Sequence, residues 1–587
     1  MPRIAAKQNL KNKPNPENNS SLAIRVMTLG LLVLVVFALP LLLDTNLPGK
    51  LPWQRVLLNI LPVGLIALVI LGVTRRSLLS FVWIVSLVSF LFYVNILKFV
   101  ELQEPLVTAD FLLIGQVVTG FDLLGRYVDI PKLVVACIVF LALCLISWKW
   151  ERPLAGPKTR LVLVLLPGVL LISLAYSGWL LGALYRSDLM LARDWNPREN
   201  VRKNGLIATL ARSGSNVLFD FPDIDQATIQ RPDFLPASPP LEMVDPADLP
   251  DIIMVLSESF FDPAVMNGVE SCEYLPEFCT LKSQGQSGWL TVPTYGGNTT
   301  RTEFELLTGI PFALFSGLDY PYISVVTRPV YSLPWHLKAL GYQTTVIHTH
   351  ERTFWRRHSA MPKLGFDQFT AKEDIEPAYR SGFWIADSVL TREIKARLER
   401  QEQDKPQFVF AISMENHGTW NAGRLSRLPG WVGGIMVPNA VKDIPGKPLQ
   451  QFLYHEQNAV SELEKLADFV QQRPRKTVLV FFGDHLPALT EVFEILGFDN
   501  DKDPSKQLLP YVVMSNFPLD YHLPQQMQSH QLMLQALYSA GIPLSESYAG
   551  LRSAYAYRVM TEDDGEKSAT DAYLLQLQTR LLHHPVR

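Results

Sequence analysis

The sequence predicts a polytopic helical membrane domain followed by an α/β domain with a mostly parallel central sheet. The chain has 587 residues, of which 48% are hydrophobic and only 19% are charged, and its long uncharged runs are confined to the first third. After residue 250, short β-branched runs alternate with helical segments, which is typical of a parallel sheet covered on both faces. All 11 histidines lie after residue 335, so metal or acid-base chemistry is expected in the second part.

Five apolar runs are long enough to cross roughly 30 Å of hydrocarbon as helices. The runs are residues 24–43, 56–73, 78–97, 133–150 and 161–182. The alternative, buried helices of a large globular core, is disfavoured because the runs follow one another closely with almost no acidic residue inside them. The sequence therefore predicts a membrane domain of five transmembrane helices over residues 1–182.

Positive charges predict the orientation of these spans. They are concentrated before the first run, between the second and third, and between the fourth and fifth, and such connections stay in the cytoplasm. An odd number of spans then places everything after about residue 183 on the extracytoplasmic side. The second part of the chain is net acidic, which argues against a nucleic-acid partner.

The connecting segments set the expected domain boundaries. Residues 99–131 are apolar but interrupted by carboxylates, which fits an interfacial segment; a packed loop and a role in admitting lipid are both compatible with it. Residues 183–250 combine an amphipathic helix, residues 204–218, with a proline-rich linker, residues 231–250. We expect the α/β domain to occupy residues 251–560 and a C-terminal tail to occupy residues 561–587.

Polar side chains follow four of the predicted strands, whose ends meet at one edge of a parallel sheet. The predicted strands are residues 252–256, 344–347, 408–412, 477–482 and 511–514. The polar residues that follow the first four are Glu258, then His348 and His350, then His417, then Asp484 and His485. Each alone could be a helix cap or a core histidine, but four such strand ends together predict a divalent metal site.

A second motif is the glycine-rich run at residues 294–304, Thr-Tyr-Gly-Gly-Asn-Thr-Thr-Arg-Thr-Glu-Phe. Glycines followed by hydroxyls at a helix start suit binding of a phosphate or sulfate oxyanion. An ordinary helix start has the same pattern. Beside a metal, one of the threonines becomes a candidate nucleophile, since a threonine hydroxyl needs activation to react.

Together these motifs resemble the lipoteichoic acid synthase and phosphoglycerol transferase family, within the alkaline phosphatase and sulfatase superfamily. The similar pieces are Ser257-Glu258-Ser259, residues 297–304, His348 with residues 354–357, residues 414–418 and residues 483–487. The five-span topology is similar too. The resemblance implies an extracytoplasmic sulfatase-like α/β domain, attached to the plasma (inner) membrane of a bacterium.

The resemblance also implies a metal site and a nucleophile. One divalent ion would be bound by Glu258, Thr299, Asp484 and His485, with Thr299, four residues before the family's glutamate, as nucleophile. This ligand set favours Mn²⁺, with Mg²⁺ and Zn²⁺ as alternatives.

The substrate contacts implied by the resemblance surround this site. His348, Trp355, Arg357 and His417 would hold the phosphoglycerol group, and His417 would bind a phosphate oxygen or protonate the leaving oxygen. Family members often have an acidic residue two positions after the first histidine, where this chain has His350.

The implied reaction moves the phosphoglycerol head group of phosphatidylglycerol to a hydroxyl of an envelope glycan or glycerol-phosphate polymer, through a phospho-threonine intermediate. Residues 348–358 contain one carboxylate and three arginines, which disfavours an ammonium head group. The alternatives are a phosphoethanolamine transferase, a membrane-tethered phosphodiesterase or sulfatase-like hydrolase, and a sensor that has lost activity. Sulfatases generally need a modified Cys or Ser in a Cys/Ser-x-Pro-x-Arg setting, and the Thr299 region has none.

The four cysteines fall into two pairs. Because the outer compartment is oxidising, Cys272 and Cys279 are expected to form a disulfide, whereas Cys137 and Cys144 are expected to remain thiols within the fourth span. Two free thiols on a surface turn are the alternative for the first pair.

Overall fold

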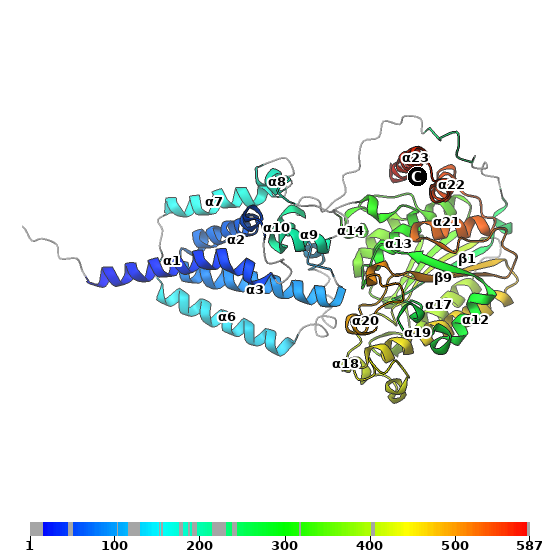
Figure 1. Ribbon diagram of the computed structural model, residues 1–587, viewed down its shortest axis with the longest axis horizontal. Helices are drawn as coiled ribbons and strands as arrows, with labels where there is room; N and C mark the ends of the chain where they lie inside the picture. The colour runs from blue at the N-terminus through cyan, green and yellow to red at the C-terminus, as the bar shows by residue number, and fades with distance from the viewer. Residues whose placement is uncertain are drawn as a thin grey trace, which may run out of the picture. The chain divides into compact units, whose positions relative to one another are not determined.

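The computed structural model describes most of the chain as two compact units (Figure 1). The described residues are 16–44, 51–102, 104–114, 129–151, 153, 157–174, 180–185, 188–190, 197–213, 230–236, 244–315, 318–400 and 405–583. One unit is built from residues 1–215 except for short pieces between residues 100 and 119, and the other contains residues 216–587.

The first unit is a helical membrane domain. Within the described residues, four helices are long and apolar enough to cross a bilayer. They are α1 (Pro16–Leu43), α2 (Trp53–Thr74), α3 (Ser77–Leu102) and α6 (Ile130–Trp150). Large apolar side chains such as Leu34 and Ile138 are exposed on them, as expected for surfaces that face lipid tails rather than water.

The described residues contain four candidate spans rather than the predicted five. The region predicted as the fifth span, residues 161–182, contains the shorter helices α7 (Pro157–Ser173) and α8 (Leu180–Tyr185), with residues 175–179 outside the described residues. At 1.5 Å per residue, the 17 residues of α7 extend about 26 Å, which is less than the hydrocarbon thickness. Because the orientation argument used an odd number of spans, the side on which the second unit lies stays a prediction.

Polar contacts tie the ends of the membrane helices together. Glu151, directly after α6, accepts hydrogen bonds from the backbone N–H groups of Ser77 and Leu78 at 2.6 and 2.8 Å, which caps the start of α3. The Arg76 guanidinium lies 3.9 Å from the centre of the Trp148 ring. The basic connection between α2 and α3 therefore lies at the same end as the C-terminus of α6, as the charge pattern predicts.

Two further segments of this unit differ in length from the expectations. The amphipathic helix expected at residues 204–218 is α10 (Leu206–Ser213), preceded by α9 (Pro197–Asn204), and residues 214–218 lie outside the described residues. The described part of residues 99–131 includes the short helix η1 (Thr108–Leu113). It folds back on α3 through an ion pair between Asp110 and Lys98 at 2.8 Å, while an interfacial role for this stretch stays a prediction.

The second unit is built on an eight-stranded, mostly parallel sheet, as predicted. The strand order is β10-β2-β9-β8-β1-β7-β3-β4, and β9 is antiparallel to both of its neighbours. The strands are β1 (Asp251–Ser257), β2 (Gln286–Thr291), β3 (Gln343–His348), β4 (Gln368–Ala371), β7 (Gln407–Ile412), β8 (Thr477–Gly483), β9 (Leu509–Ser515) and β10 (Gln526–Gln528). A separate hairpin pairs β5 (Arg380–Ser381) with β6 (Trp384–Ile385).

Helices cover both faces of the sheet because its central strands are apolar on both sides. Every residue of β1 is buried, and alternate side chains enter different cores: Met254 joins one cluster and Ile253 another. The first cluster includes residues of α13 (Thr299–Thr308), α15 (Leu333–Ala339), α16 (Arg357–Lys363), α21 (Ser529–Ser539), α22 (Glu546–Met560) and α23 (Asp564–His583). The second includes residues of α12 (Pro276–Gln284), α17 (Asp387–Glu399) and α19 (Pro448–Gln472).

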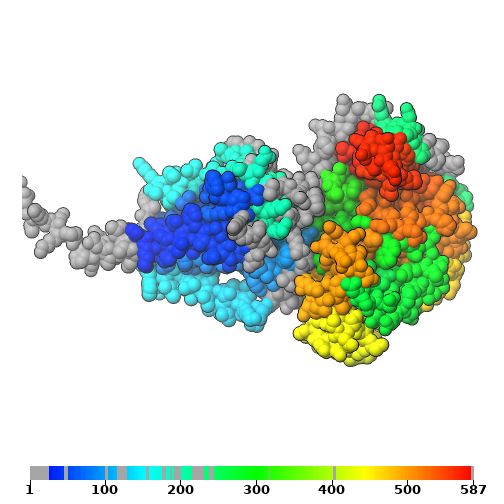
Figure 2. Space-filling view, viewed as in Figure 1, coloured from blue at the N-terminus to red at the C-terminus, as the bar shows by residue number. Residues whose placement is uncertain are grey.

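Short elements complete the second unit. They include α11 (Ser271–Tyr274), α14 (Pro321–Ser324), η5 (Phe354–Arg356), α18 (Ala422–Leu425), η7 (Gly430–Gly434) and α20 (Thr490–Leu496). The segment that contains α18 and η7 forms part of the visible surface, in yellow in Figure 2. The stretch predicted as a C-terminal tail contains α23.

The cysteine prediction is confirmed. Cys272 and Cys279 form a disulfide with a Cα–Cα distance of 5.7 Å, and it joins α11 to α12. Cys137 and Cys144 are free thiols within α6, the fourth candidate span.

A close backbone approach at Gly483 gives a first prediction. A Cβ at this position would lie 1.9 Å from the carbonyl oxygen of Phe260, so Gly483→Ala requires the backbone to move. Because overpacking a core costs roughly 1–3 kcal/mol and more when the backbone must shift, we expect the unfolding free energy to fall by about 3 kcal/mol. Denaturant unfolding of the detergent-solubilised full chain measures this loss.

Gly430→Ala is the matched control, because a Cβ at Gly430 meets no atom within 4 Å. Equal losses of unfolding free energy in the two variants would contradict the packing argument.

Candidate active site

The register of the sheet brings the ends of four parallel strands to one edge. Ser257 at the end of β1 pairs with Gly483 at the end of β8, and Ile412 at the end of β7 pairs with Leu256 and with His348 of β3. The residues that follow these strand ends are therefore neighbours in space, which is where ligands bind in sheets of this type.

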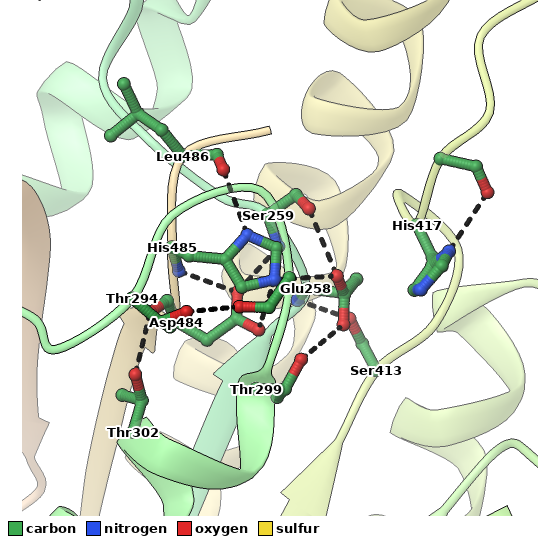
Figure 3. Close-up of polar contacts among 12 residues, drawn as sticks. Glu258, Ser259, Thr294, Thr299, Thr302, Ser413, His417, Asp484, His485 and Leu486 are labelled. Carbon is green, nitrogen blue, oxygen red and sulfur yellow. Dashed lines mark hydrogen bonds and ion pairs between the residues drawn. The ribbon is translucent and has the colours of Figure 1, made fainter. Parts of the chain in front are cut away.

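Three of the predicted metal ligands meet at this edge. Glu258, Asp484 and His485 are buried, and one potential ligand atom from each lies within 4.8 Å of the other two. His485 Nε2 is 3.4 Å from Glu258 Oε1 and 3.2 Å from Asp484 Oδ2, and Figure 3 shows the three side chains converging.

The hydrogen bonding of His485 indicates why a cation fits this cluster. His485 Nδ1 lies 3.0 Å from the carbonyl oxygen of Leu486, so Nδ1 donates to this carbonyl and Nε2 is the nitrogen that can offer a lone pair to a cation. Neither Nε2 nor Asp484 Oδ2 has a hydrogen-bond partner among the described residues. Facing acceptors repel one another unless a proton or a cation lies between them, and carboxylate and imidazole ligands suit a divalent ion.

The local backbone fixes the two carboxylates. Ser259 has a left-handed backbone with φ of 55°, which is uncommon outside glycine. In this conformation its N–H donates to Asp484 Oδ1 at 2.8 Å and its hydroxyl donates to Glu258 Oε1 at 3.1 Å. The N–H of Glu258 donates to Ser413 Oγ at 3.0 Å. Burial, together with the Asp484 carboxylate, raises the pKa of Glu258 well above its usual range.

The glycine-rich motif places Thr299 beside this cluster. Asn298 has a φ of 61° and Thr299 begins α13, with its hydroxyl 3.5 Å from Glu258 Oε2. Thr302, one turn along, donates to the carbonyl oxygen of Asp484 at 2.9 Å. Thr300 is fully buried and its hydroxyl has no partner within the described part of the chain, so the hydroxyl brought to the cluster is that of Thr299.

Arg357 lies in a buried polar group next to the cluster. Its guanidinium forms a two-bond ion pair with Glu303, with Nε 3.2 Å from Oε2, and the Tyr322 hydroxyl donates to the same carboxylate at 2.9 Å. Its Nη1 lies 3.2 Å from His348 Nε2. The guanidinium charge is therefore balanced by Glu303.

His348 is a neutral, fully buried ring that supports Arg357. Its Nδ1 lies 3.3 Å from the Ile412 carbonyl oxygen, and burial together with the Arg357 charge lowers the pKa of His348 well below its usual value. With Nδ1 donating to that carbonyl and Nε2 accepting from Arg357, both ring nitrogens have protein partners. His348 therefore acts on the site through Arg357 in this arrangement.

The other predicted contacts lie around these two groups. Trp355 packs on Tyr320, with ring centres 4.9 Å apart. His350 stacks on Phe354 at 4.4 Å. His417 follows β7, and Figure 3 draws it to one side of the Glu258 cluster.

Three supporting residues were not assigned a role from the sequence. Glu303 balances Arg357, Ser413 fixes the backbone of Glu258, and the Trp384 indole donates to the His417 carbonyl oxygen at 2.8 Å. The sequence signal for Glu303 was its place in the glycine-rich motif; Ser413 and Trp384 carried no comparable signal because their partners are distant in the chain.

Residues 250–537 match the family model described as Sulfatase. This chain carries a sulfatase-family domain. The match agrees with the superfamily that the motifs resemble.

Two relatives from Rhizobium meliloti (strain 1021) are similar over much of the chain. One, named a putative cyclic beta-1,2-glucan modification protein, is 27% identical over an alignment of 449 residues that covers 71% of this chain and 66% of that protein. The other, the capsular polysaccharide biosynthesis protein RkpI, is 29% identical over an alignment of 406 residues that covers 67% of this chain and 70% of that protein.

Two solved structures are similar to this chain. The Streptococcus pyogenes phosphoglycerol transferase GacH in complex with sn-glycerol-1-phosphate is 20% identical, with coverage of 57% of this chain and 86% of that chain and a TM-score of 0.47. The lipooligosaccharide phosphoethanolamine transferase A from Neisseria meningitidis is 12% identical. The similarity covers 82% of this chain and 91% of that chain, with a TM-score of 0.46.

The facing acceptors predict metal binding. Wild-type chain equilibrated with Mn²⁺ and then desalted should retain about one ion per chain, because the three side chains offer ligands to a single ion. The Asp484→Ala, His485→Ala double variant should retain almost none, as measured by elemental analysis. Glu456→Gln is the control, since Glu456 is a buried carboxyl outside the cluster. This variant should leave the bound Mn²⁺ per chain unchanged. Stoichiometric metal in the double variant would refute the site.

The buried ion pair predicts a large stability effect. Glu303→Gln leaves the Arg357 charge buried without its counter-ion, and breaking a buried pair in this way costs about 3–5 kcal/mol of unfolding free energy. Asp571→Asn breaks the exposed pair of Arg558 and Asp571 and should cost less than about 1 kcal/mol. Denaturant unfolding of both variants measures the difference, and similar small losses would show that Glu303 does not balance Arg357.

Proposed function

We propose that the protein is a membrane-anchored phosphoglycerol transferase. It would move the head group of phosphatidylglycerol to a hydroxyl of an envelope glycan or glycerol-phosphate polymer. The observation that carries the proposal is the Thr299 hydroxyl at the start of α13, next to the facing acceptors of Glu258, Asp484 and His485. A hydroxyl nucleophile beside a cation site is the arrangement that covalent phosphoryl transfer needs.

The residues present fit a divalent ion, and we favour Mn²⁺ because two carboxylates, one imidazole and one hydroxyl are hard to borderline ligands. Such an ion would lower the pKa of the Thr299 hydroxyl and offset negative charge on the phosphate oxygens. The helix start at Thr299 adds backbone N–H groups and the positive end of the helix dipole, which favour an oxyanion.

The transfer has two displacements at phosphorus. In the first, Thr299 Oγ forms a bond to phosphorus, the bond to the diacylglycerol oxygen breaks, and that oxygen takes up a proton equivalent to the one Thr299 loses. In the second, an acceptor hydroxyl forms the new phosphodiester and Thr299 regains its hydroxyl proton. We assign the proton transfer at the diacylglycerol oxygen to His417, whose Nδ1 lies 2.9 Å from the Gly418 carbonyl oxygen, because an imidazole can both donate and accept a proton.

The surroundings favour a glycerol head group over an ethanolamine one. The rings of His350 and His417 both lie against Trp384, and Arg357 is adjacent to His348. The carboxylate of this segment, Glu351, pairs with Lys372 at 3.5 Å, so it is drawn away from a cationic substrate. Imidazole and guanidinium groups can hydrogen-bond a polyol, and the positive charge of the guanidinium disfavours an ammonium group.

Two further observations support the location and the acceptor class. The Cys272–Cys279 disulfide favours an oxidising compartment and therefore an extracytoplasmic second unit, beside the plasma (inner) membrane of a bacterium. The names of the two Rhizobium relatives refer to glucan modification and to capsular polysaccharide biosynthesis, which fits a glycan acceptor.

The proposal predicts a covalent adduct on Thr299. Purified chain with Mn²⁺ and phosphatidylglycerol should release diacylglycerol and gain the mass of one phosphoglycerol group on the peptide that contains Thr299, while phosphatidylethanolamine should give little product. Thr299→Ala should lower the rate by at least about a thousandfold, because the covalent step is lost.

Thr300→Val is the matched control, since the Thr300 hydroxyl has no partner in the described structure; it should keep the adduct. An active Thr299→Ala variant would exclude this nucleophile, and preference for phosphatidylethanolamine would overturn the donor. Release of free glycerol phosphate without transfer to added glycan would favour the hydrolase.

A further inference from the structure

The carbonyl oxygen of His417 is held by two side chains from other parts of the fold. His417 lies five residues beyond the end of β7, in a turn closed by its N–H donating to the Met414 carbonyl oxygen at 3.0 Å. Its own carbonyl oxygen accepts from Trp384 Nε1 at 2.8 Å and from Nη1 of Arg424. A carbonyl oxygen has two lone pairs, so both are directed at fixed donors.

Arg424 belongs to a structure built around this loop. It is fully buried, and its Nη2 donates to the Glu415 carbonyl oxygen at 2.5 Å. A Cβ on Gly382, in the hairpin of β5 and β6, would lie 3.2 Å from Arg424 Nε, and Gly382 has a φ of +65°. The hairpin therefore covers the guanidinium through a glycine, and the two carbonyls have little freedom to move.

Trp384 links the same hairpin to two of the histidines around the site. Its side chain is 5% exposed, and its ring centre lies 5.0 Å from that of His417 and 5.4 Å from that of His350. Because His417 Nδ1 lies against the neighbouring Gly418 carbonyl, the ring direction depends on the position of this peptide, to which the indole N–H is also bonded at 3.2 Å.

We propose that Trp384 is a positioning residue, which together with Arg424 fixes the His417 peptide and thereby aims the His417 imidazole at the reacting phosphate. The proposal rests on the proposed function in taking His417 as the residue that meets the substrate. Trp384 itself acts through His417, so its contribution should vanish when the imidazole is absent.

The test is a double-mutant cycle with a substitution that spares the packing. Trp384→Phe keeps an aromatic ring against the two histidines but removes the N–H that donates to the His417 carbonyl. Trp335→Phe is the matched control, because Trp335 Nε1 donates in the same way to the Lys363 carbonyl oxygen at 2.9 Å. Each change is made in the full chain, alone and with His417→Gln.

Two quantities are measured for each variant: kcat/KM for diacylglycerol release and Kd for sn-glycerol-1-phosphate by calorimetry. Trp384→Phe should lower kcat/KM about tenfold and weaken binding about threefold in the wild-type background, yet change both less than twofold in the His417→Gln background, since coupled residues are non-additive. Trp335→Phe should leave both quantities within about twofold in either background.

Equal effects of Trp384→Phe in the two backgrounds would overturn the proposal, because Trp384 would then act independently of His417. Wild-type kinetics and binding in His417→Gln would overturn it as well. A wild-type chain that releases no diacylglycerol would count against the proposed function, while the binding cycle would still decide the coupling of Trp384 to His417.

Discussion

The convergence of three buried potential ligand atoms is the constraint around which the site is organised. Glu258 Oε1 and Asp484 Oδ2 both lie within 3.4 Å of His485 Nε2. Burying these polar groups together is costly unless a proton or a cation lies between them, and the backbone holds them in place. The left-handed Ser259, the glycine at position 483 and the aligned ends of β1 and β8 all contribute to that restriction.

Comparison with other buried carboxylates shows what is particular about this cluster. Glu303 receives donors from Arg357 and Tyr322, and Glu415 receives them from His455 at 2.9 Å and Asn458 at 2.6 Å. Glu456 Oε2 has no partner among the described residues, and burial raises the pKa of Glu456 well above its usual range, but Glu456 does not belong to the group of three potential ligands. Only a cluster of several facing acceptors creates a position that suits a multivalent ion.

The sequence was informative wherever the signal was local and continuous. The central strands were predictable because strands buried on both faces read as unbroken apolar runs, as in β1 and β8. The same reading predicted that Glu258, Asp484 and His485 would meet, since parallel strands end at one edge. It failed at the fifth span, because a hydropathy window over residues 161–182 does not detect that α7 ends at Ser173.

The rest of the site depends on contacts between residues far apart in the chain. The motif alone did not distinguish Thr299 from Thr300, because that choice depends on which hydroxyl faces Glu258, 41 residues earlier. Trp384 meets the His417 carbonyl across 33 residues. Such pairings depend on how the helices pack and where the loops run. A single sequence has no hydrophobic periodicity or residue spacing that predicts either. The sequence therefore identified the residues that carry the reactive groups. The residues that hold those groups in place are evident only in the folded structure.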